Sequence, residues 1–368
     1  MPMALIGVVS IRCGTMRKYL ILAPHEFLEN AKTAHGVIRY GTDEIVAVVD
    51  PDHVGKTVRD VLPHLQSDVP FVSGVQQGLA LKPSALLIGV APKGGALPQS
   101  WRNEILAAID AKLEIVSGLH DLLSEDAEFA AAAQRNGTSI WDVRVPPPVP
   151  LFSGAAYDIK APILLTVGSD CAVGKMTVSL ELARAARERG KNSIFVPTGQ
   201  TGIMIAGWGI AVDRVISDFA PGASEQLVLQ ADPNADLIVV EGQGSIYHPA
   251  YAPVTLALLY GCAPDALLLV VDPTRPSIES FNTPRLGYRE LVDIYDRVCA
   301  PVKPAPVVGI ALNTRAMTPA QAQAEIARAH DETGLPADDV VRNGPSVLYE
   351  AIAAHIVKRR PLGTEVLA

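Results

Sequence analysis

The sequence has little cysteine, few aromatic residues and an excess of acidic over basic charge. Its four cysteines, Cys13, Cys171, Cys262 and Cys299, form no C-x-x-C pair and have no histidine cluster beside them. That spacing argues against a disulfide framework and against a structural zinc site. With a formal net charge of -8 the chain offers no basic field to a polyanion, so nucleic acid is a poor partner. These shortages favour a reducing, cytoplasmic setting.

A long uninterrupted hydrophobic run is also missing. The most apolar stretch, residues 254–271, contains Pro264 and Asp265 and therefore predicts a helix, a turn and a strand. The first fifteen residues include ALIGVVSI but lack a preceding basic region and a small-residue cleavage site, so they resemble a signal peptide only weakly. Met16 is an alternative natural start. We expect no membrane partner.

What the chain does contain is a large apolar fraction arranged in strand-length runs. Hydrophobic residues make up 49% and charged residues 19% of 368 positions, which predicts two globular domains and surface for a homo-oligomer interface. Both halves alternate strands with helices, the pattern of three-layer α/β domains with ligands at the carboxyl ends of parallel strands. The predicted strands are 45–49, 85–90, 114–116, 163–167, 193–197, 236–240, 266–271 and 307–312. The predicted helices are 100–112, 174–190, 222–231, 252–261, 285–299 and 318–330.

The boundary between the halves is predicted at the proline-rich run VPPPVP, residues 145–150, which can neither supply ladder donors nor continue a helix. We expect a Rossmann-like N-terminal domain at 16–145, a linker at 146–158 and a P-loop NTPase-like C-terminal domain at 159–368. The N-terminal loop APKGG, 91–95, can approach a ligand closely or serve as an ordinary turn.

The segment GSDCAVGKMT follows the predicted strand 163–167 and opens the predicted helix 174–190. This is the context of a phosphate-binding loop, in which backbone N–H groups, the helix dipole and a lysine face a phosphate. We expect it to bind the phosphates of a cofactor through Gly168, Ser169, Asp170, Cys171, Ala172, Val173, Gly174, Lys175, Met176 and Thr177. By contrast HVGKT, 53–57, has Asp50 where the first loop glycine belongs and predicts no phosphate site.

One position of this loop departs from the usual pattern. Met176 stands where a Ser or Thr hydroxyl normally binds Mg²⁺, and Thr177 is rotated by about 100° from that place on a helix. The loop is therefore equipped to hold phosphates but poorly equipped to hold Mg²⁺, which suits coenzyme A and predicts no metal. Cys171 could carry an acyl group, although we expect it to be a small residue that fills the loop.

Further polar residues follow the neighbouring strands. Glu241 and His248, in EGQGSIYHPAY, are alternative general bases, and Gln243 and Ser245 are candidate oxyanion donors. Gln200, in PTGQTG, and Asn313 are candidate cofactor contacts, Asn313 as a reader of adenine. Arg275, Arg285 and Arg315 are candidates for binding an acidic substrate; Arg275 and Arg285 could equally be solvated charges, and Arg315 could clamp a phosphate or a carboxylate.

Together, GSDCAVGKMT, PTGQTGI, VVEGQGSIYHPAY, IGVAPKGG and IVSGLH resemble the DgcN-type D-glutamate N-acetyltransferase family, formerly a domain of unknown function, over almost the whole chain. The resemblance implies acetyl transfer from acetyl-CoA to the amino group of D-glutamate. It also implies an enolase-type N-acetyl-amino-acid racemase as the pathway partner. The C-terminal half is more distantly similar to dethiobiotin synthetase, through the glycine spacing of the phosphate loop and VVEG, but Met176 departs from that pattern.

Three rival functions remain open. An ATP-dependent ligase resembling dethiobiotin synthetase would require ATP and Mg²⁺, against which Met176 counts. A CoA or nucleotide sensor would bind without turnover and tolerate changes at Glu241 and His248. A dinucleotide-dependent oxidoreductase ranks last, because no G-x-G-x-x-G follows the N-terminal strands.

Overall fold

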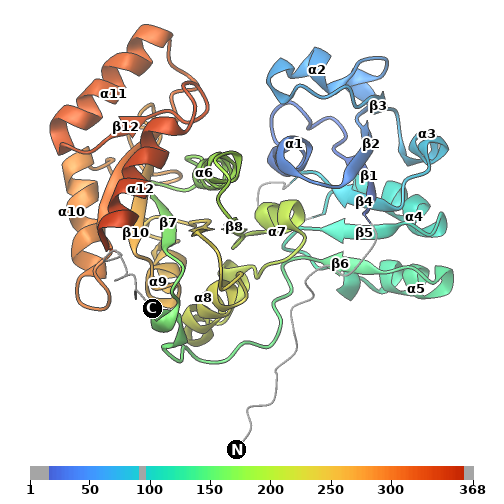
Figure 1. Ribbon diagram of the computed structural model, residues 1–368. Coiled ribbons are helices and arrows are strands. Elements are labelled where there is room, and N and C mark those ends of the chain that lie inside the picture. Colours follow the sequence, from blue (N-terminus) through green and yellow to red (C-terminus); the bar gives the residue numbers. More distant parts are fainter. Residues whose placement is uncertain (1–15, 91–96, 360–368) are drawn as a thin grey trace, which may run out of the picture. The chain divides into compact units, whose positions relative to one another are not determined.

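The computed structural model describes residues 16–90 and 97–359 and divides the chain into two compact units (Figure 1). The first unit runs to Pro147 and includes residues Gly199–Arg214, and the second holds Pro148–Thr198 and the chain from Val215 onward. The chain passes from the first unit to the second between Pro147 and Pro148, inside the run VPPPVP. The loop APKGG, 91–95, lies outside the described residues.

The first unit is a doubly wound α/β domain. Its six strands are all parallel and follow the order β3-β2-β1-β4-β5-β6, the order of a Rossmann fold. The strands are β1 Lys18–Leu22, β2 Glu44–Val49, β3 Phe71–Val72, β4 Ala85–Ile88, β5 Glu114–Ser117 and β6 Ile140–Asp142. The helices are α1 Lys32–Tyr40, α2 Val58–Val61, α3 Val75–Gly78, α4 Arg102–Asp110, α5 Ala127–Asn136 and α7 Gln200–Ala206.

Helix α7 joins this unit although its sequence neighbours, β8 and α8, belong to the other. It packs against α1, and the hydroxyl oxygens of Thr33 and Thr201 lie 3.0 Å apart in that contact. Gly118, which follows β5, lets the start of α7 lie close to that strand, because a Cβ at this position would lie 2.9 Å from Cγ of Gln200.

The second unit is a parallel six-stranded sheet with helices on both faces. Its strand order is β12-β11-β10-β7-β9-β8, with β7 and β10 at the centre and every residue of both strands buried. The strands are β7 Ile163–Gly168, β8 Ser193–Val196, β9 Leu237–Val240, β10 Ala266–Val271, β11 Val307–Leu312 and β12 Ala337–Asp338. The helices are α6 Lys175–Glu188, α8 Ala220–Leu229, α9 Ala252–Gly261, α10 Tyr288–Cys299, α11 Pro319–Thr333 and α12 Ser346–Arg359.

The α/β fold class predicted from the sequence is confirmed, and each strand and helix predicted there is present with ends shifted by at most three residues. The structure adds elements that the apolar pattern did not indicate, among them β1, β3, β6, α1, α7, β12 and α12. Among the described residues, no helix combines the length and the apolar character that a bilayer crossing demands.

Candidate functional site

The phosphate loop connects the central strand β7 to α6 in the second unit. Gly174, which precedes the helix, has φ +114°, a conformation that favours glycine. A Cβ at Gly168 would lie 2.9 Å from Nζ of Lys175, so this glycine makes room for the lysine. The loop therefore has the backbone shape that lets N–H groups at the start of a 14-residue helix face an anion.

Lys175 ties the phosphate loop to the segment that follows β9. Its Nζ donates to the carbonyl oxygens of Asp170, at 2.7 Å, and Gly244, at 2.8 Å, and the side chain is buried. Gly242 lets the segment after β9 lie close to β7, because a Cβ at Gly242 would lie 1.6 Å from the carbonyl oxygen of Thr166. The N–H of Gly242 donates to the Thr166 hydroxyl at 2.9 Å. The ammonium is thus held where the two loops meet.

Tyr295 of α10 makes a second link between the same loops. Its hydroxyl donates to the carbonyl oxygen of Gly168 at 2.7 Å and accepts from the N–H of Ile246 at 3.1 Å. Burial raises the pKa of this phenol to about 12, so it stays protonated and keeps donating at neutral pH. Sequence reasoning missed Tyr295 because a tyrosine in an amphipathic helix carries no local signal of a polar role.

Asp170 connects the phosphate loop to the segment after β10. Its carboxylate accepts from the N–H of Cys171 at 2.7 Å and from the N–H of Glu279 at 2.8 Å, and Nη1 of Arg275 lies 3.3 Å away. Arg275 also donates to the carbonyl oxygens of Cys171, at 2.9 Å, and Ala172, at 3.4 Å. Because Ala172 has φ +52°, a strained conformation for alanine, the arginine braces the part of the loop that most needs support.

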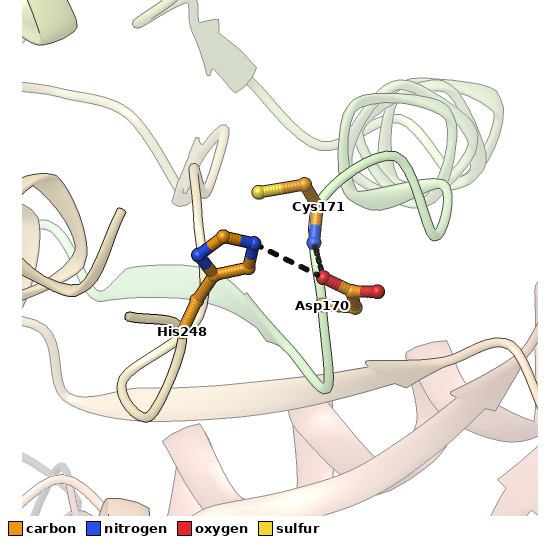
Figure 2. Close-up of side chains that lie close together, drawn as sticks. All are labelled: Asp170, Cys171 and His248. Carbon is orange, nitrogen blue, oxygen red and sulfur yellow. Dashed lines mark hydrogen bonds and ion pairs between the residues drawn. The ribbon is translucent and has the colours of Figure 1, made fainter. Parts of the chain in front are cut away.

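His248 lies against this braced loop (Figure 2). Its Nε2 is 3.7 Å from Oδ1 of Asp170, and its Nδ1 accepts from the N–H groups of Ala250 and Tyr251 at 3.1 and 3.3 Å. Asp170, Cys171 and His248 present one ligand-type atom each within 4.8 Å of one another. Burial raises the pKa of the Cys171 thiol to about 11, so at neutral pH it is the thiol and not the thiolate.

The other residues predicted after β9 belong to the same unit. Glu241 is buried and accepts at Oε2 from the N–H of Thr198 at 3.1 Å. Gln243 donates through Nε2 to the carbonyl oxygen of Thr198, which holds its side-chain amide at the end of β8. Ser245 is buried, and its carbonyl oxygen accepts from the N–H of His248 at 3.0 Å. The structure thus assembles carboxylate, amide, hydroxyl and imidazole groups around the carboxyl ends of neighbouring strands.

Four further candidates occupy different surroundings. Asn313 donates from Nδ2 to the carbonyl oxygen of Val173 at 3.2 Å, so it contacts the phosphate loop itself. Arg285 donates to backbone carbonyls of its own segment and stacks on Tyr288, with its guanidinium carbon 5.4 Å from the ring centroid. Arg315 is exposed, and within the described parts of the chain its guanidinium has no hydrogen-bond partner. Gln200 belongs to the first unit.

The segment after β10 also shapes an open cavity. Residues 274–282 line a hollow of about 520 Å³, and this segment includes Arg275 and Phe281. The ring of Phe281 lies edge-on to His248 with centroids 5.3 Å apart. The cavity therefore lies beside the phosphate loop and the His248 ring.

The magnesium-facing position of the loop is filled by an apolar side chain. Met176 is 7% exposed and is the second residue of α6. A thioether is a poor ligand for Mg²⁺, which takes oxygen ligands. Lys175 and the backbone at the start of α6 are thus the groups of this loop that can donate to an anion, while Met176 offers no hydroxyl to a metal.

Comparisons with known proteins agree over most of the chain. A family model described as a domain of unknown function, DUF1611_C P-loop domain, matches residues 150–349, and one described as the DUF1611_N Rossmann-like domain matches residues 51–146. A D-glutamate N-acetyltransferase of Tritonibacter scottomollicae is 38% identical over 286 residues, 76% of this chain and 84% of the relative. Another of that name from a Pseudoalteromonas species is 36% identical over 269 residues, 70% of this chain and 78% of the relative. A crystal structure of a DUF1611 family protein from Anabaena variabilis superposes with a TM-score of 0.87 at 39% identity, covering 92% of this chain and 99% of that one.

Proposed function

The chain belongs to the DUF1611 family, and from this membership and its phosphate loop we propose that it is a D-glutamate N-acetyltransferase that takes its acetyl group from acetyl-CoA. Two relatives of that name share 36% and 38% of their aligned residues with this chain over at least 70% of its length. Their name supplies the substrate and the reaction.

One observation carries the choice of donor: a phosphate loop with its lysine and glycines intact but with buried Met176 at the magnesium position. In acetyl-CoA the phosphates are a handle far from the reacting thioester, and they need no metal for bond cleavage. Lys175, the start of α6 and the backbone around Gly174 would hold them. ATP cleavage, by contrast, depends on a metal that bridges the phosphates.

The reaction needs an amine with a free electron pair. The amino nitrogen attacks the thioester carbonyl carbon, the carbonyl oxygen becomes an oxyanion, and a base removes one proton from the nitrogen. When the tetrahedral intermediate collapses, the C–S bond breaks and the thiol of coenzyme A leaves with a proton. The carbonyl oxygen of Gly244 accepts from Lys175, so the turn at 243–245 meets the phosphate loop, and backbone N–H groups of this turn are our candidates to stabilise the oxyanion.

Glu241 is the base we favour. It lies at the end of a buried strand, and the N–H of Thr198 fixes one of its oxygens. A carboxylate held in this way keeps one orientation toward an incoming amine, as general-base catalysis requires. The imidazole of His248 is oriented differently, because its Nδ1 already accepts from two backbone N–H groups.

The acidic substrate requires a cation, and the three candidate arginines differ in their availability. Arg275 and Arg285 are engaged with backbone carbonyls, whereas the exposed guanidinium of Arg315 has no hydrogen-bond partner among the described residues. We therefore assign Arg315 to an anionic group of the substrates, either a glutamate carboxylate or a coenzyme phosphate.

We also propose an oligomeric state, a cellular compartment and a pathway partner for the enzyme. Large apolar side chains are exposed in the second unit, Ile216 by 75% and Leu151 by 59%, which favours a homo-oligomer. Together with the acidic net charge and the scattered cysteines, this suggests a cytoplasmic assembly. An N-acetyl-D-amino acid is a substrate for an enolase-type racemase, which we propose as the next enzyme.

The test measures thiol release from acetyl-CoA with D-glutamate, L-glutamate and a panel of other D-amino acids, each with and without EDTA. We expect release that depends on D-glutamate and persists in EDTA. Parallel reactions with ATP and Mg²⁺ should release no ADP. Magnesium-dependent ADP release without thiol would replace the proposal with an ATP-dependent ligase, and tight binding of acetyl-CoA without turnover would replace it with a sensor.

A further inference from the structure

We propose that His248 is a positioning residue, a fixed Nε2–H donor directed at Asp170, and that it does not act as the general base. The inference rests on the proposed acetyl transfer for its kinetic meaning. Two structural parts of it can be tested without turnover: which ring nitrogen of His248 carries the proton, and whether the ring binds a metal.

The contacts of the ring assign its tautomer. Nδ1 lies 3.1 Å from the backbone N of Ala250 and 3.3 Å from that of Tyr251. Both groups are N–H donors, so Nδ1 must present its lone pair to them. A neutral imidazole has only one ring proton, which then resides on Nε2.

The ring has little freedom to turn away from this arrangement. His248 is 1% exposed, and its ring lies 4.7 Å from that of Tyr251 and edge-on to Phe281. Nε2 points toward Asp170 Oδ1 at 3.7 Å, longer than a direct hydrogen bond but close enough for attraction between the N–H dipole and a carboxylate (Figure 2).

This geometry is unsuited to two other roles. To act as a base the ring must accept a proton at Nδ1, which would turn two backbone contacts from attractive to repulsive. To bind a metal with Asp170 and Cys171, Nε2 must lose its proton, and the proton that moves to Nδ1 would meet the same two donors. In the cluster of Figure 2, His248 therefore acts on Asp170 through the Nε2–H dipole and neither as a base nor as a metal ligand.

Asp170 transmits the effect of His248 to the phosphate loop. The carboxylate also holds the N–H of Glu279 and the guanidinium of Arg275, and Arg275 in turn donates to the carbonyls of Cys171 and Ala172. A donor that keeps Asp170 in place thus stabilises a loop that contains a left-handed alanine. Protein contacts thereby brace a phosphate loop that lacks the usual metal-binding hydroxyl.

The charged and titratable groups around this ring come from three segments. Asp170 and Cys171 belong to the phosphate loop, Tyr251 belongs to the segment of His248 itself, and Arg275 and Glu279 belong to the segment after β10. Among these groups Asp170 is the partner that the Nε2–H faces directly.

The first experiment is nuclear magnetic resonance of the full chain labelled with ¹⁵N-histidine, using long-range correlations between ring nitrogens and carbon-bound protons. His248 is assigned as the signal lost in His248→Gln. We expect an unprotonated Nδ1 and a protonated Nε2 at neutral pH, unchanged when Zn²⁺ is added. A proton on Nδ1, protons on both nitrogens, or displacement by Zn²⁺ would overturn the proposal.

The second experiment compares His248→Ala with His248→Gln, whose side-chain NH₂ can replace the Nε2–H donor. We expect His248→Ala to raise the KM for acetyl-CoA about fivefold, less than the loss of a full hydrogen bond to a charged group would cause, because the contact with Asp170 is 3.7 Å long. The change in kcat should be much smaller. His248→Gln should recover much of that KM. In the wild-type protein kcat should fall at low pH as the general base becomes protonated. This fall should remain in both variants.

Two outcomes would make His248 the base and refute the proposal. In one, kcat of His248→Gln no longer falls at low pH; in the other, kcat falls by orders of magnitude while KM is unchanged. The control is His330→Gln, since His330 is exposed in α11 and its ring makes one hydrogen-bond contact within the described parts of the chain, from Nδ1 to the carbonyl oxygen of Leu335. If the wild-type protein acetylates no amine, the proposed function fails, while the resonance experiment still decides the tautomer.

Discussion

Replacing Lys175 with methionine should weaken the grip on phosphates while leaving the chemistry at the thioester intact. Nζ of Lys175 donates to two loop carbonyls at 2.7 and 2.8 Å, so the ammonium is already held in place before a phosphate arrives. A hydrogen bond to a charged group contributes about 1.5 to 3 kcal/mol. We therefore expect the KM for acetyl-CoA to rise about 10- to 150-fold, since each 1.4 kcal/mol is about a factor of ten.

The assay distinguishes binding of the coenzyme A phosphates from chemistry at the thioester. Acetyl-CoA is compared with S-acetyl-pantetheine, which carries the same thioester without phosphates, at saturating D-glutamate and with thiol release as the readout. Lys175→Met should raise the KM for acetyl-CoA and leave kcat/KM for S-acetyl-pantetheine nearly unchanged.

The control is Lys191→Met, because Lys191 is exposed after α6. Urea unfolding of each variant measures the loss of the two carbonyl contacts, which costs stability whether or not phosphate binds. An equal loss of kcat/KM for both thioesters would refute the reasoning, because it would place Lys175 at the acetyl group or in the loop's folding alone.

Three further predictions follow from other contacts. Cys171→Ser should keep kcat, and the wild-type protein incubated with acetyl-CoA should show no acetyl adduct by mass spectrometry, because burial raises the pKa of the Cys171 thiol to about 11 and keeps it protonated at neutral pH. Loss of turnover in the variant together with an adduct on the wild-type protein would show an acyl-enzyme. Gly242→Ala should lower the free energy of unfolding by more than about 2 kcal/mol, since the new Cβ would meet the Thr166 carbonyl oxygen; an unchanged urea midpoint would contradict this. Asp126→Asn keeps the N-cap of α5 but removes the negative charge that pairs with Arg102, whose hydrogen bond lowers the pKa of Asp126 to about 2. The loss of stability, below about 1 kcal/mol at pH 7, should be full above about pH 4 and disappear as the pH falls through about 2. A loss that persists unchanged at and below about pH 2 would exclude the charge as its cause.

Much of the fold could be predicted because the strands of both sheets are short apolar runs. Buried strands such as 163–167 and 266–271 carry hydrophobic residues at nearly every position, as parallel strands with two covered faces require. The elements that escaped prediction have weaker patterns. Strand β3 has two residues, and α7 lies in a glycine-rich stretch whose contact with α1 involves residues 168 positions apart.

The candidate site residues divide in the same way. That the phosphate loop, Glu241 and His248 lie in one part of the second unit could be predicted, because each follows a buried strand and strand ends in a parallel sheet meet at one edge. The roles of the arginines could not. Arg275 was a candidate for an acidic substrate, but its guanidinium lies against two loop carbonyls that only the folded chain brings within reach.

The sequence by itself determined the two α/β units, the phosphate loop and the absence of a hydroxyl at Met176, because these depend on local periodicity and on spacing within a few residues. The tertiary structure decided how that loop is held. The loop is held by contacts among Asp170, Tyr295, Arg275 and His248, which come from segments separated by up to 125 positions. These contacts exist only once the sheet has placed those segments side by side. Long-range contacts of this kind leave no periodic trace in a chain, which is the physical reason why they required the structure.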